Sequence, residues 1–210
     1  MTGAATGAPR AQATTLSGLL TFGHGTASRD ELLDVLRGAG VEAVVDVRRF
    51  PGSRRHPHVA RDELARWLPE AGLAYRWEPR LGGRRSRPKE GEGPANETGE
   101  PANPDPWWRV AAFAAYAAHT RTDEFRAATA ELLEGVARQR TTVLCSESLW
   151  WRCHRRLVAD VAVLLHGVPV HHLGHDGGLT EHVPAAGARV AADGVRYDRV
   201  EDVDRSGAPG

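Results

Sequence analysis

The sequence contains only two cysteines, Cys145 and Cys153. A secreted scaffold held together by disulfides is therefore not expected, and both thiols are predicted to stay reduced in a cytosol. No apolar run reaches the roughly 18 residues of a membrane-spanning helix, and the N-terminus lacks the basic start and apolar segment of a secretory signal. No Gly-rich Walker pattern occurs, which argues against a P-loop helicase or polymerase. These absences predict a soluble, cytoplasmic protein without membrane contact.

The net charge is zero, so the chain as a whole is not a bulk binder of polyanions. The charge is unevenly distributed, because Arg48 to Lys89 carries eleven Arg and one Lys against four acids, a net charge of +8. The stretch from Asp193 to Asp204 is acidic. The basic stretch is either a solvated face or a groove for nucleic acid, in which Arg contacts phosphate and aromatic side chains stack on bases. The interleaved aromatic residues are Trp67, Trp77, Trp107 and Trp108.

The composition, 41% hydrophobic and 26% charged, is that of an ordinary globular protein. The first segment, residues 1–16, is small and polar without periodicity and is predicted to be a disordered tail. Residues 17–176 are predicted to form a single α/β domain. Within it, residues 82–106 are rich in Gly, Pro and charge and are expected to form a mobile loop. Residues 177–210 are expected to be an irregular polar C-terminal extension that ends in a tail.

The alternation of strand and helix patterns predicts the fold class. Residues 19–22 form a short apolar strand, Ser28 and Glu31 have the spacing of a capping box before a helix, and residues 41–47 form the next strand. Strand, helix and strand at this spacing make a βαβ unit with parallel strands. Further strands are predicted at 73–77, 141–145 and 168–173, and helices at 61–68, 107–118, 122–138 and 152–166. The prediction is an α/β protein, a mostly parallel sheet with helices on both faces.

Polar residues follow three of the predicted strands. In parallel sheets, ligands bind outside the carboxyl ends of the strands, so these residues are candidates for chemistry. His24 lies between two glycines that permit close approach of a ligand, or it is a loop residue without a role. Asp46 is either an acid or base, or it holds Arg48 or His24 in place. Cys145 ends a buried strand and either has a functional thiol or is a small buried residue.

The segment from Cys145 to Arg155 carries the strongest signal. The start of the helix after Cys153 is an anion site, and nearby arginines add positive charge, so the pKa of the Cys145 thiol is expected to be lowered. Glu147 is a candidate acid or base, or it caps the helix. Cys153 is expected to be structural, or a resolving thiol for Cys145. Positive charge at a helix start predicts an anionic ligand or a carboxylate nearby.

The pattern C-x-E-x5-C-H-R from Cys145 to Arg155 resembles the signature of the domain-of-unknown-function family 488. The resemblance covers residues 19–175, and it includes the segments at 21–25, 46–48 with Pro51 and Ser53, 81–83, and an aromatic helix around Phe113 and Tyr116. It implies the family's fold and the importance of these segments, and it implies little about the reaction. The sequence departs from the family at residues 149–152, where Trp150 and Trp151 are expected to reshape the mouth of the site.

A weaker, topological similarity links the chain to rhodanese-type sulfurtransferases and Cys-based phosphatases. In those enzymes a short loop cradles an anion around a cysteine at the end of a strand. Here the segment from Cys145 to Arg152 is one or two residues longer than such loops, so the similarity serves only as an analogy.

Metal binding is not predicted. Potential nitrogen and sulfur ligands are present, but none falls into paired C-x2-C or H-x3-H spacing. No cofactor is expected either. The residues considered were Cys145, Cys153, His154, His171, His172, His175 and His182.

Three functional hypotheses follow. The first is an enzyme acting on a phosphate-bearing substrate, DNA, RNA or a nucleotide, by base processing or base excision. The second is a rhodanese-like sulfurtransferase with a persulfide on Cys145, and the third is a non-catalytic anion-binding module. The candidate catalytic residues are Cys145, Glu147, Asp46 and His24. The candidate substrate-binding residues are Arg48, Arg49, Arg54, Arg55, His154, Arg155, Trp150 and Trp151.

Overall fold

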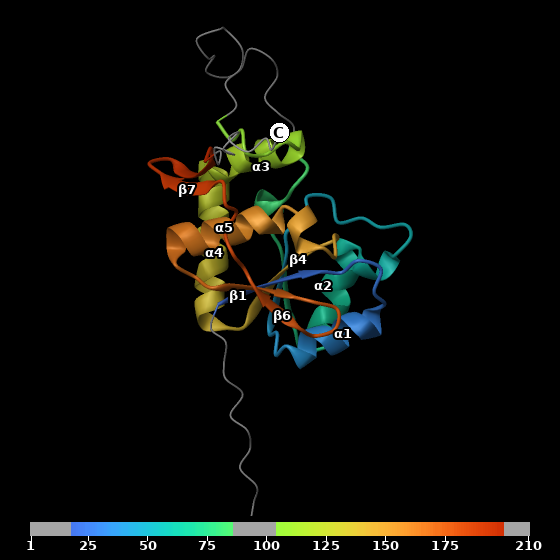
Figure 1. Cartoon of the computed structure of the whole chain (residues 1–210). Helices are drawn as coiled ribbons and strands as arrows, with labels where there is room; N and C mark the ends of the chain where they lie inside the picture. Colours follow the sequence, from blue (N-terminus) through green and yellow to red (C-terminus); the bar gives the residue numbers. More distant parts are fainter. Residues whose placement is uncertain (1–17, 86–103, 200–210) are drawn as a thin grey trace, which may run out of the picture.

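The computed structural model describes residues 18–85 and 104–199 (Figure 1). The predicted tail at 1–16, most of the predicted mobile loop at 82–106, and residues 200–210 lie outside these described ranges.

A six-stranded sheet with the order β3-β2-β4-β1-β5-β6 forms the centre of the domain. All neighbouring strands are parallel except β6, which runs antiparallel to β5. The mostly parallel sheet predicted from the sequence is therefore confirmed. The strands are β1 (Leu19–Gly23), β2 (Ala43–Asp46), β3 (Ala74–Trp77), β4 (Thr141–Cys145), β5 (Val170–Leu173) and β6 (Leu179–Glu181).

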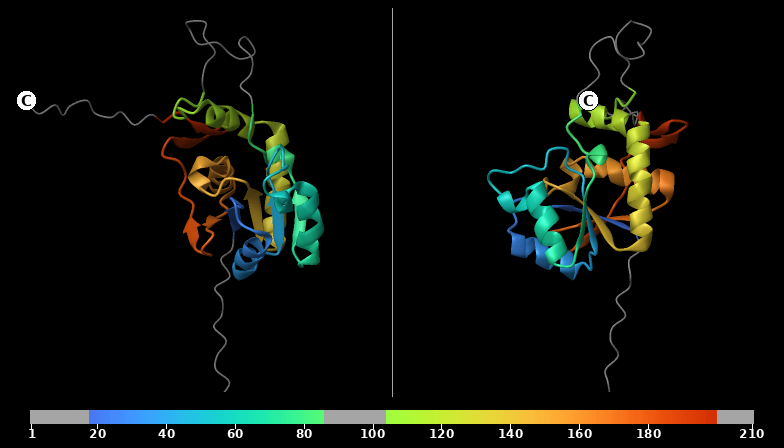
Figure 2. Two further views of the ribbon diagram at one scale, coloured as in Figure 1. Left: turned by 90° about the vertical axis from the view of Figure 1, so that its right-hand side faces the viewer. Right: turned by 180° about the vertical axis from the view of Figure 1, so that it is seen from behind.

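Helices cover both faces of this sheet, as the sequence predicted (Figures 1 and 2). One face packs against α1 (Arg29–Gly38) and α2 (Arg61–Glu70). The other face packs against α3 (Ala111–Thr120), α4 (Asp123–Arg138) and α5 (Arg155–His166). Successive strand residues point to opposite faces, so in β4 Val143 and Cys145 face α5 while Leu144 faces α1 and α2.

Local sequence signals explain where several elements begin and end. The predicted capping box is present, since the Ser28 hydroxyl accepts from the Glu31 N–H and the Glu31 carboxylate accepts from the Ser28 N–H at 2.7 Å. Thr122 caps α4 by accepting from the Phe125 N–H at 3.3 Å. Gly167 ends α5 in the left-handed conformation, with φ of 63°.

The helix predicted from residue 152 begins later, at Arg155. The chain first forms a short 3-10 turn at Trp150–Arg152 and then extends at Cys153, where φ is −121° and ψ is 149°. No side chain caps the start of α5, and its first turn contains no acidic residue. Two further 3-10 turns, Pro57–Val59 and Pro79–Leu81, follow β2 and β3.

The expected irregular extension at 177–210 requires a correction, because residues 177–199 are largely structured. Strand β6 joins the edge of the main sheet, and β7 (Ala188–Ala191) and β8 (Gly194–Tyr197) form an antiparallel hairpin. Val195 and Tyr197 are buried against α3 and α5. The sequence pattern missed these strands because each has three or four residues and at most two buried apolar side chains.

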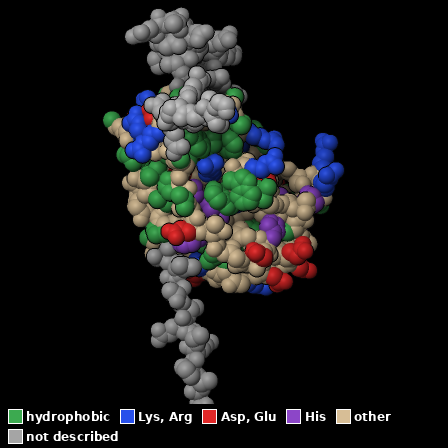
Figure 3. Space-filling view, viewed as in Figure 1, with side chains coloured by type: hydrophobic (Ala, Val, Ile, Leu, Met, Phe, Trp, Pro, Cys, Tyr) green, Lys and Arg blue, Asp and Glu red, His purple; other side chains and the backbone are tan. Residues whose placement is uncertain are grey.

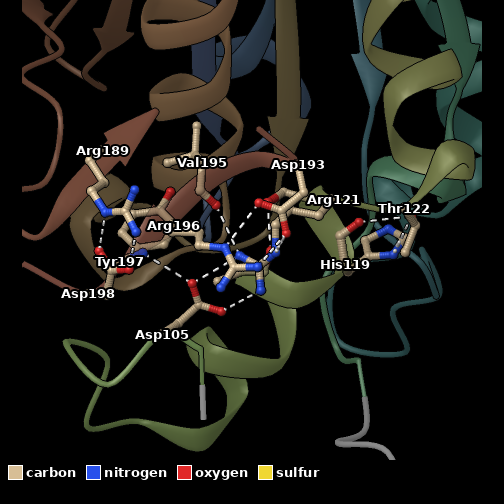
Figure 4. Close-up of polar contacts among 12 residues, drawn as sticks. Asp105, His119, Arg121, Thr122, Arg189, Asp193, Val195, Arg196, Tyr197 and Asp198 are labelled. Atoms are coloured by element: carbon tan, nitrogen blue, oxygen red, sulfur yellow. Dashed lines mark hydrogen bonds and ion pairs between the residues drawn. The ribbon is translucent and has the colours of Figure 1, made fainter. Parts of the chain in front are cut away.

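A buried carboxylate attaches the hairpin to the domain. Asp105 accepts two hydrogen bonds from Arg121, at 2.9 and 2.7 Å, and one from the Tyr197 N–H at 3.1 Å (Figure 4). Arg121 also donates to the Val195 carbonyl at 3.0 Å. The hairpin is therefore held by an ion pair as well as by apolar packing.

Within the described residues, no helix combines the length and the apolar character that crossing a membrane requires.

Candidate functional site

The carboxyl ends of β1, β4 and β2 lie side by side, because β4 is the neighbour of both other strands. Gly23 is level with Cys145, and Asp46 is level with Leu144. The residues that follow these three strands therefore emerge at one edge of the sheet. This is the juxtaposition that the sequence predicted for the site.

A cavity of about 470 Å³ lies at this edge, within the size range of ligand pockets. Its lining contains one carboxylate, that of Glu147, as far as the described residues show. Of the residues predicted from the sequence, His24, Arg48, Arg49, Cys145, Glu147 and His154 line it, whereas Asp46, Arg54, Arg55, Arg155, Trp150 and Trp151 do not.

Asp46 holds Arg48 through a buried ion pair, the contact that the sequence left open as an alternative. Its side chain is fully buried, and both oxygens are occupied. Oδ1 accepts from the Arg48 N–H at 3.0 Å and from Arg48 Nε at 2.8 Å, while Oδ2 accepts from Arg48 Nη2 at 2.6 Å and from the Tyr75 hydroxyl at 3.0 Å. No part of Asp46 faces the cavity, so it is not placed to exchange a proton with a substrate.

His24 is held by the same network. Its Nδ1 donates to the Gly25 carbonyl at 2.9 Å, which leaves Nε2 to accept from Arg48 Nη1 at 3.1 Å. Burial, and then the positive charge of Arg48, lower the pKa of His24 to about 4. The imidazole is therefore neutral near pH 7, with both nitrogens engaged. It forms part of the cavity wall and orients Arg48.

Arg155 lies beneath the loop after β4 and is 1% exposed, so it is not a substrate-binding residue at the surface. Its guanidinium donates to the carbonyls of Glu147 and Ser148, and its Nε donates to Cys153 Sγ at 3.4 Å. Gly23 leaves room for this arrangement, because a Cβ there would clash with the Glu147 carbonyl and lie 2.6 Å from Arg155 Nη2. Arg155 thus fixes the backbone that presents Glu147.

Two thiols and one imidazole lie close together in the lining of the cavity. His154 Nδ1 lies 3.8 Å from Cys145 Sγ and 3.6 Å from Cys153 Sγ. The ring of His154 packs edge-on against Tyr116, with centroids 5.0 Å apart. Cys145 and Cys153 are 6% and 4% exposed, so the cavity reaches only a small part of each sulfur.

The ionisation of the two thiols differs from the sequence-based expectation. The pKa of Cys153 is lowered, first by a hydrogen bond from the Cys145 thiol and then, after an opposing effect of burial, by the charge of Arg155. The pKa of Cys145 is raised, because it shares its proton with Cys153 and is buried. The lowered pKa expected for Cys145 was therefore wrong, and the more acidic thiol is the one beside Arg155.

Glu147 is exposed and belongs to the cavity lining. Its Oε1 accepts from the Leu149 N–H at 3.2 Å, the local capping contact that the sequence left as an alternative. No other hydrogen bond engages this carboxylate among the described residues.

Three exposed arginines line the cavity without a carboxylate partner in the described part of the chain: Arg49, Arg84 and Arg152. Arg54 and Arg55 are exposed on the same loop as Arg49 but outside the lining. Figure 3 shows Arg side chains gathered mainly on the upper half of one face, while Asp and Glu lie mainly lower down. Most other arginines of the basic stretch pair with acids, as Arg66 does with Glu63 at 2.5 Å.

The tryptophans do not form the predicted groove. Trp67 is buried in the core, and Trp77 donates to the Arg48 carbonyl at 2.8 Å. Trp150 stacks on His172 with ring centroids 3.9 Å apart, and Trp151 is half exposed outside the cavity lining. Trp107 and Trp108 pack around the guanidinium of Arg156.

An aromatic side chain that sequence analysis did not single out is Phe50, which lines the cavity and is 65% exposed. The guanidinium of Arg49 lies 5.6 Å from the centre of its ring.

Sequence analysis also missed Arg84, which adopts a left-handed backbone with φ of 58°. This conformation is uncommon for residues other than glycine, and it occurs often at functional sites. The neighbouring Gly82–Gly83 pair was noted in the sequence, and the structure explains it. A Cβ on Gly83 would lie 2.8 Å from His154 Nδ1, and one on Gly82 would lie 2.9 Å from the Arg49 backbone nitrogen. The position of Arg84 directly after this glycine pair is the feature of the sequence that could have pointed to it.

The fold and the edge site together define an α/β protein with a basic, thiol-containing pocket at the carboxyl ends of its parallel strands. A family model described as domain of unknown function DUF488 matches residues 28–162, and the chain belongs to this family. The match includes the 145–155 segment but not His24 or the C-terminal hairpin. No curated protein matches the chain. No solved structure matches it either.

Proposed function

We propose that this protein is an enzyme that acts on a phosphate-bearing substrate, a nucleotide or a nucleic acid, bound in the cavity at the sheet edge. The observation that carries the proposal is the composition of the cavity lining. Three exposed arginines without carboxylate partners among the described residues share the lining with Glu147, its one carboxylate there. An anionic group would be attracted to the arginines and would lie within reach of a proton donor or acceptor.

The backbone adds to the positive potential of this pocket. Helix α5 begins directly after His154, without a capping side chain and without an acid in its first turn. The partial positive charge at a helix start is thus not neutralised by a local carboxylate. The exposed ring of Phe50 offers a surface on which a base could stack, as aromatic side chains do in proteins that bind single strands.

Glu147 is the residue proposed to transfer a proton in the reaction. It lines the cavity, is exposed, and has only the one contact with the Leu149 N–H. Asp46 and His24 act as positioning residues because they hold Arg48 through charged and neutral hydrogen bonds. The reaction that we propose is processing or excision of a base, because such chemistry can use a carboxylate in a basic pocket.

Binding is tested with a fluorescent single-stranded oligonucleotide and with a mononucleotide, titrated at several salt concentrations. If three arginines contact phosphate, log K should fall with log salt with a slope of about −2 for a single strand. The variants Arg49→Ala and Arg152→Ala should weaken binding and flatten this slope. Arg54→Ala and Arg55→Ala are the matched controls, since they remove exposed arginines outside the cavity. Affinity that is insensitive to salt would contradict the proposal.

Turnover is tested by incubating oligonucleotides and nucleotides with the protein and identifying released bases or phosphate by mass spectrometry. Glu147→Gln should keep the binding affinity and lose the reaction, because the amide cannot exchange the proton. If wild-type protein binds these ligands but converts none of them, the non-catalytic anion-binding module becomes the better description.

The sulfurtransferase alternative depends on a thiol that carries sulfur. The thiols of Cys145 and Cys153 face each other and His154 and are almost buried, which leaves little room for a persulfide to reach a second substrate. Glu147→Gln separates the two reactions, since it should abolish nucleotide conversion and leave sulfur transfer through Cys145 intact. DNA or RNA as the partner and the cytoplasmic location stay predictions.

A further inference from the structure

We propose that Cys145, Cys153 and His154 bind a zinc ion, with the fourth coordination position open to the cavity. The sequence pattern predicted no metal, because the two cysteines lack the paired spacing of known zinc motifs. The structure brings the three side chains together from the end of β4 and from the residues just before α5. Their ligand atoms all lie within 4.8 Å of one another.

The distances fit tetrahedral coordination. Zinc lies about 2.3 Å from a thiolate sulfur and about 2.0–2.1 Å from an imidazole nitrogen, so these two ligand atoms are roughly 3.6 Å apart around one ion. In the structure His154 Nδ1 lies 3.6 Å from Cys153 Sγ and 3.8 Å from Cys145 Sγ. Both nitrogen–sulfur distances are therefore close to those that tetrahedral zinc requires.

The ligand set selects the kind of metal. Two thiolates and one imidazole are soft or borderline ligands, which suit zinc and do not suit magnesium or calcium, whose preferred ligands are oxygens. Binding releases the two thiol protons to solvent, and the doubly charged ion then neutralises the two thiolates. This matters for Cys145 and Cys153 because both are almost buried, at 6% and 4% exposure.

The surroundings hold the ligands in place. Arg155 Nε donates to Cys153 Sγ at 3.4 Å, a hydrogen bond of the kind that orients the ligands of metal sites. The ring of His154 is held between Tyr116, whose ring centroid lies 5.0 Å from its own, and the backbone of Gly83.

Three protein ligands and one open position are the pattern of catalytic rather than structural zinc sites. All three proposed ligands line the cavity, together with Glu147 and Arg152. The open position thus faces the space where the substrate would bind. That a phosphate oxygen, or a water beside Glu147, occupies the open coordination position rests on the proposed function. The zinc site itself rests only on the three ligands.

The experiment uses the full-length protein, reduced and freed of metal with a chelator. Zinc is titrated in competition with a chromogenic chelator, and cobalt is bound as a spectroscopic substitute. We expect one zinc ion per chain and, with cobalt, the absorption bands of tetrahedral coordination together with a thiolate charge-transfer band. Cys145→Ser, Cys153→Ser and His154→Asn should each weaken binding by about 100-fold or more. His171→Asn, on β5 and outside the cluster, is the matched control.

A second measurement uses only the wild-type protein and therefore does not depend on whether the variants fold. Zinc should protect both cysteines of the wild-type protein from alkylation, as counted by mass spectrometry. Absence of stoichiometric zinc binding, or alkylation at unchanged rates, would overturn the zinc site. Oligonucleotide binding is measured on metal-free and zinc-loaded protein in parallel. Salt-dependent oligonucleotide binding by a protein that binds no zinc would overturn only the metal site. Zinc binding without any affinity for nucleotides would overturn only the proposed function.

Discussion

Asp46 and Arg48, two residues apart at the end of β2, form a buried ion pair in which both carboxylate oxygens accept from the guanidinium, at 2.8 and 2.6 Å. The Asp46 side chain is fully buried and that of Arg48 is 7% exposed. Arg48 further donates to the Val59 carbonyl at 2.8 Å. The pair therefore connects the strand end to the loop that carries Arg49 and Phe50.

Replacing Asp46 with Ala should destabilise the protein by about 3–5 kcal/mol, because it leaves the Arg48 charge buried without its partner. Asp46→Asn keeps one acceptor and should cost less. Urea unfolding measures both. Asp62→Ala is the control, since Asp62 pairs with Arg61 at the surface and is 84% exposed. Equal stability of the Asp46→Ala variant and the Asp62→Ala control would refute the importance of the buried pair.

Replacing Gly23 with Ala should displace the loop after β4, since the new methyl group would collide with the Glu147 carbonyl and crowd Arg155. Such overpacking costs about 1–3 kcal/mol. We also expect weaker oligonucleotide binding, because the same loop positions Glu147 and Arg152. Thermal denaturation and fluorescence anisotropy provide the two readouts.

Gly38→Ala is the matched control for that substitution. Gly38 ends α1, and a Cβ there would have no neighbour within 4 Å. Alanine favours helix over glycine by up to about 1 kcal/mol, so this variant should be as stable as the parent or more so. If both glycine variants behave alike, the close approach of the Glu147 carbonyl to Gly23 has no energetic consequence.

The unfolding free energy should fall as the pH is lowered from about 6.5 to about 4. Burial lowers the pKa of His24 to about 4 and that of His172 to about 3, whereas an unfolded histidine titrates near 6.5. The unfolded chain thus binds more protons in this range, and stability declines with decreasing pH by up to about 1.4 kcal/mol per pH unit for each histidine.

The contribution of His24 to this pH dependence is isolated by His24→Asn, which retains a donor and an acceptor but does not titrate. The slope of unfolding free energy against pH should become shallower for this variant. His166→Asn, an exposed position at the end of α5, should leave the slope as it is. An unchanged slope for His24→Asn would show that His24 titrates alike in both states.

Replacing Asp105 with Ala should release the β7–β8 hairpin. Asp105 is fully buried and is bound by Arg121 and by the Tyr197 N–H. We expect a loss of about 3–5 kcal/mol, because the nearly buried Arg121 guanidinium loses its two hydrogen bonds to this carboxylate. Trypsin should then cut earlier at Arg189 and Arg196 in the hairpin, as followed by mass spectrometry. Asp198→Ala, which removes a partly exposed ion pair with Arg189 in the same hairpin, should not accelerate cleavage comparably.

The elements that the sequence predicted well are those with strong local signals. Strand β4 runs from Thr141 to Cys145 as expected from its apolar run, and the Ser28 capping box begins α1. Weak local signals were missed. The strands of the C-terminal hairpin are four residues long and depend on the buried Val195 and Tyr197 and on the distant Asp105 for their stability.

What the sequence by itself determined was the order of strands and helices, and with it the edge of the sheet at which polar residues emerge, because alternation and capping act over a few residues. Only the tertiary structure decided what each polar side chain does there. In the folded chain Asp46 forms a buried ion pair with Arg48, and the buried Arg155 donates a hydrogen bond to the Glu147 carbonyl. The tertiary structure also brought two thiols and an imidazole within coordination distance. These contacts depend on how strands separated by about a hundred residues are placed in register, and the spacing of residues along the chain does not encode that placement.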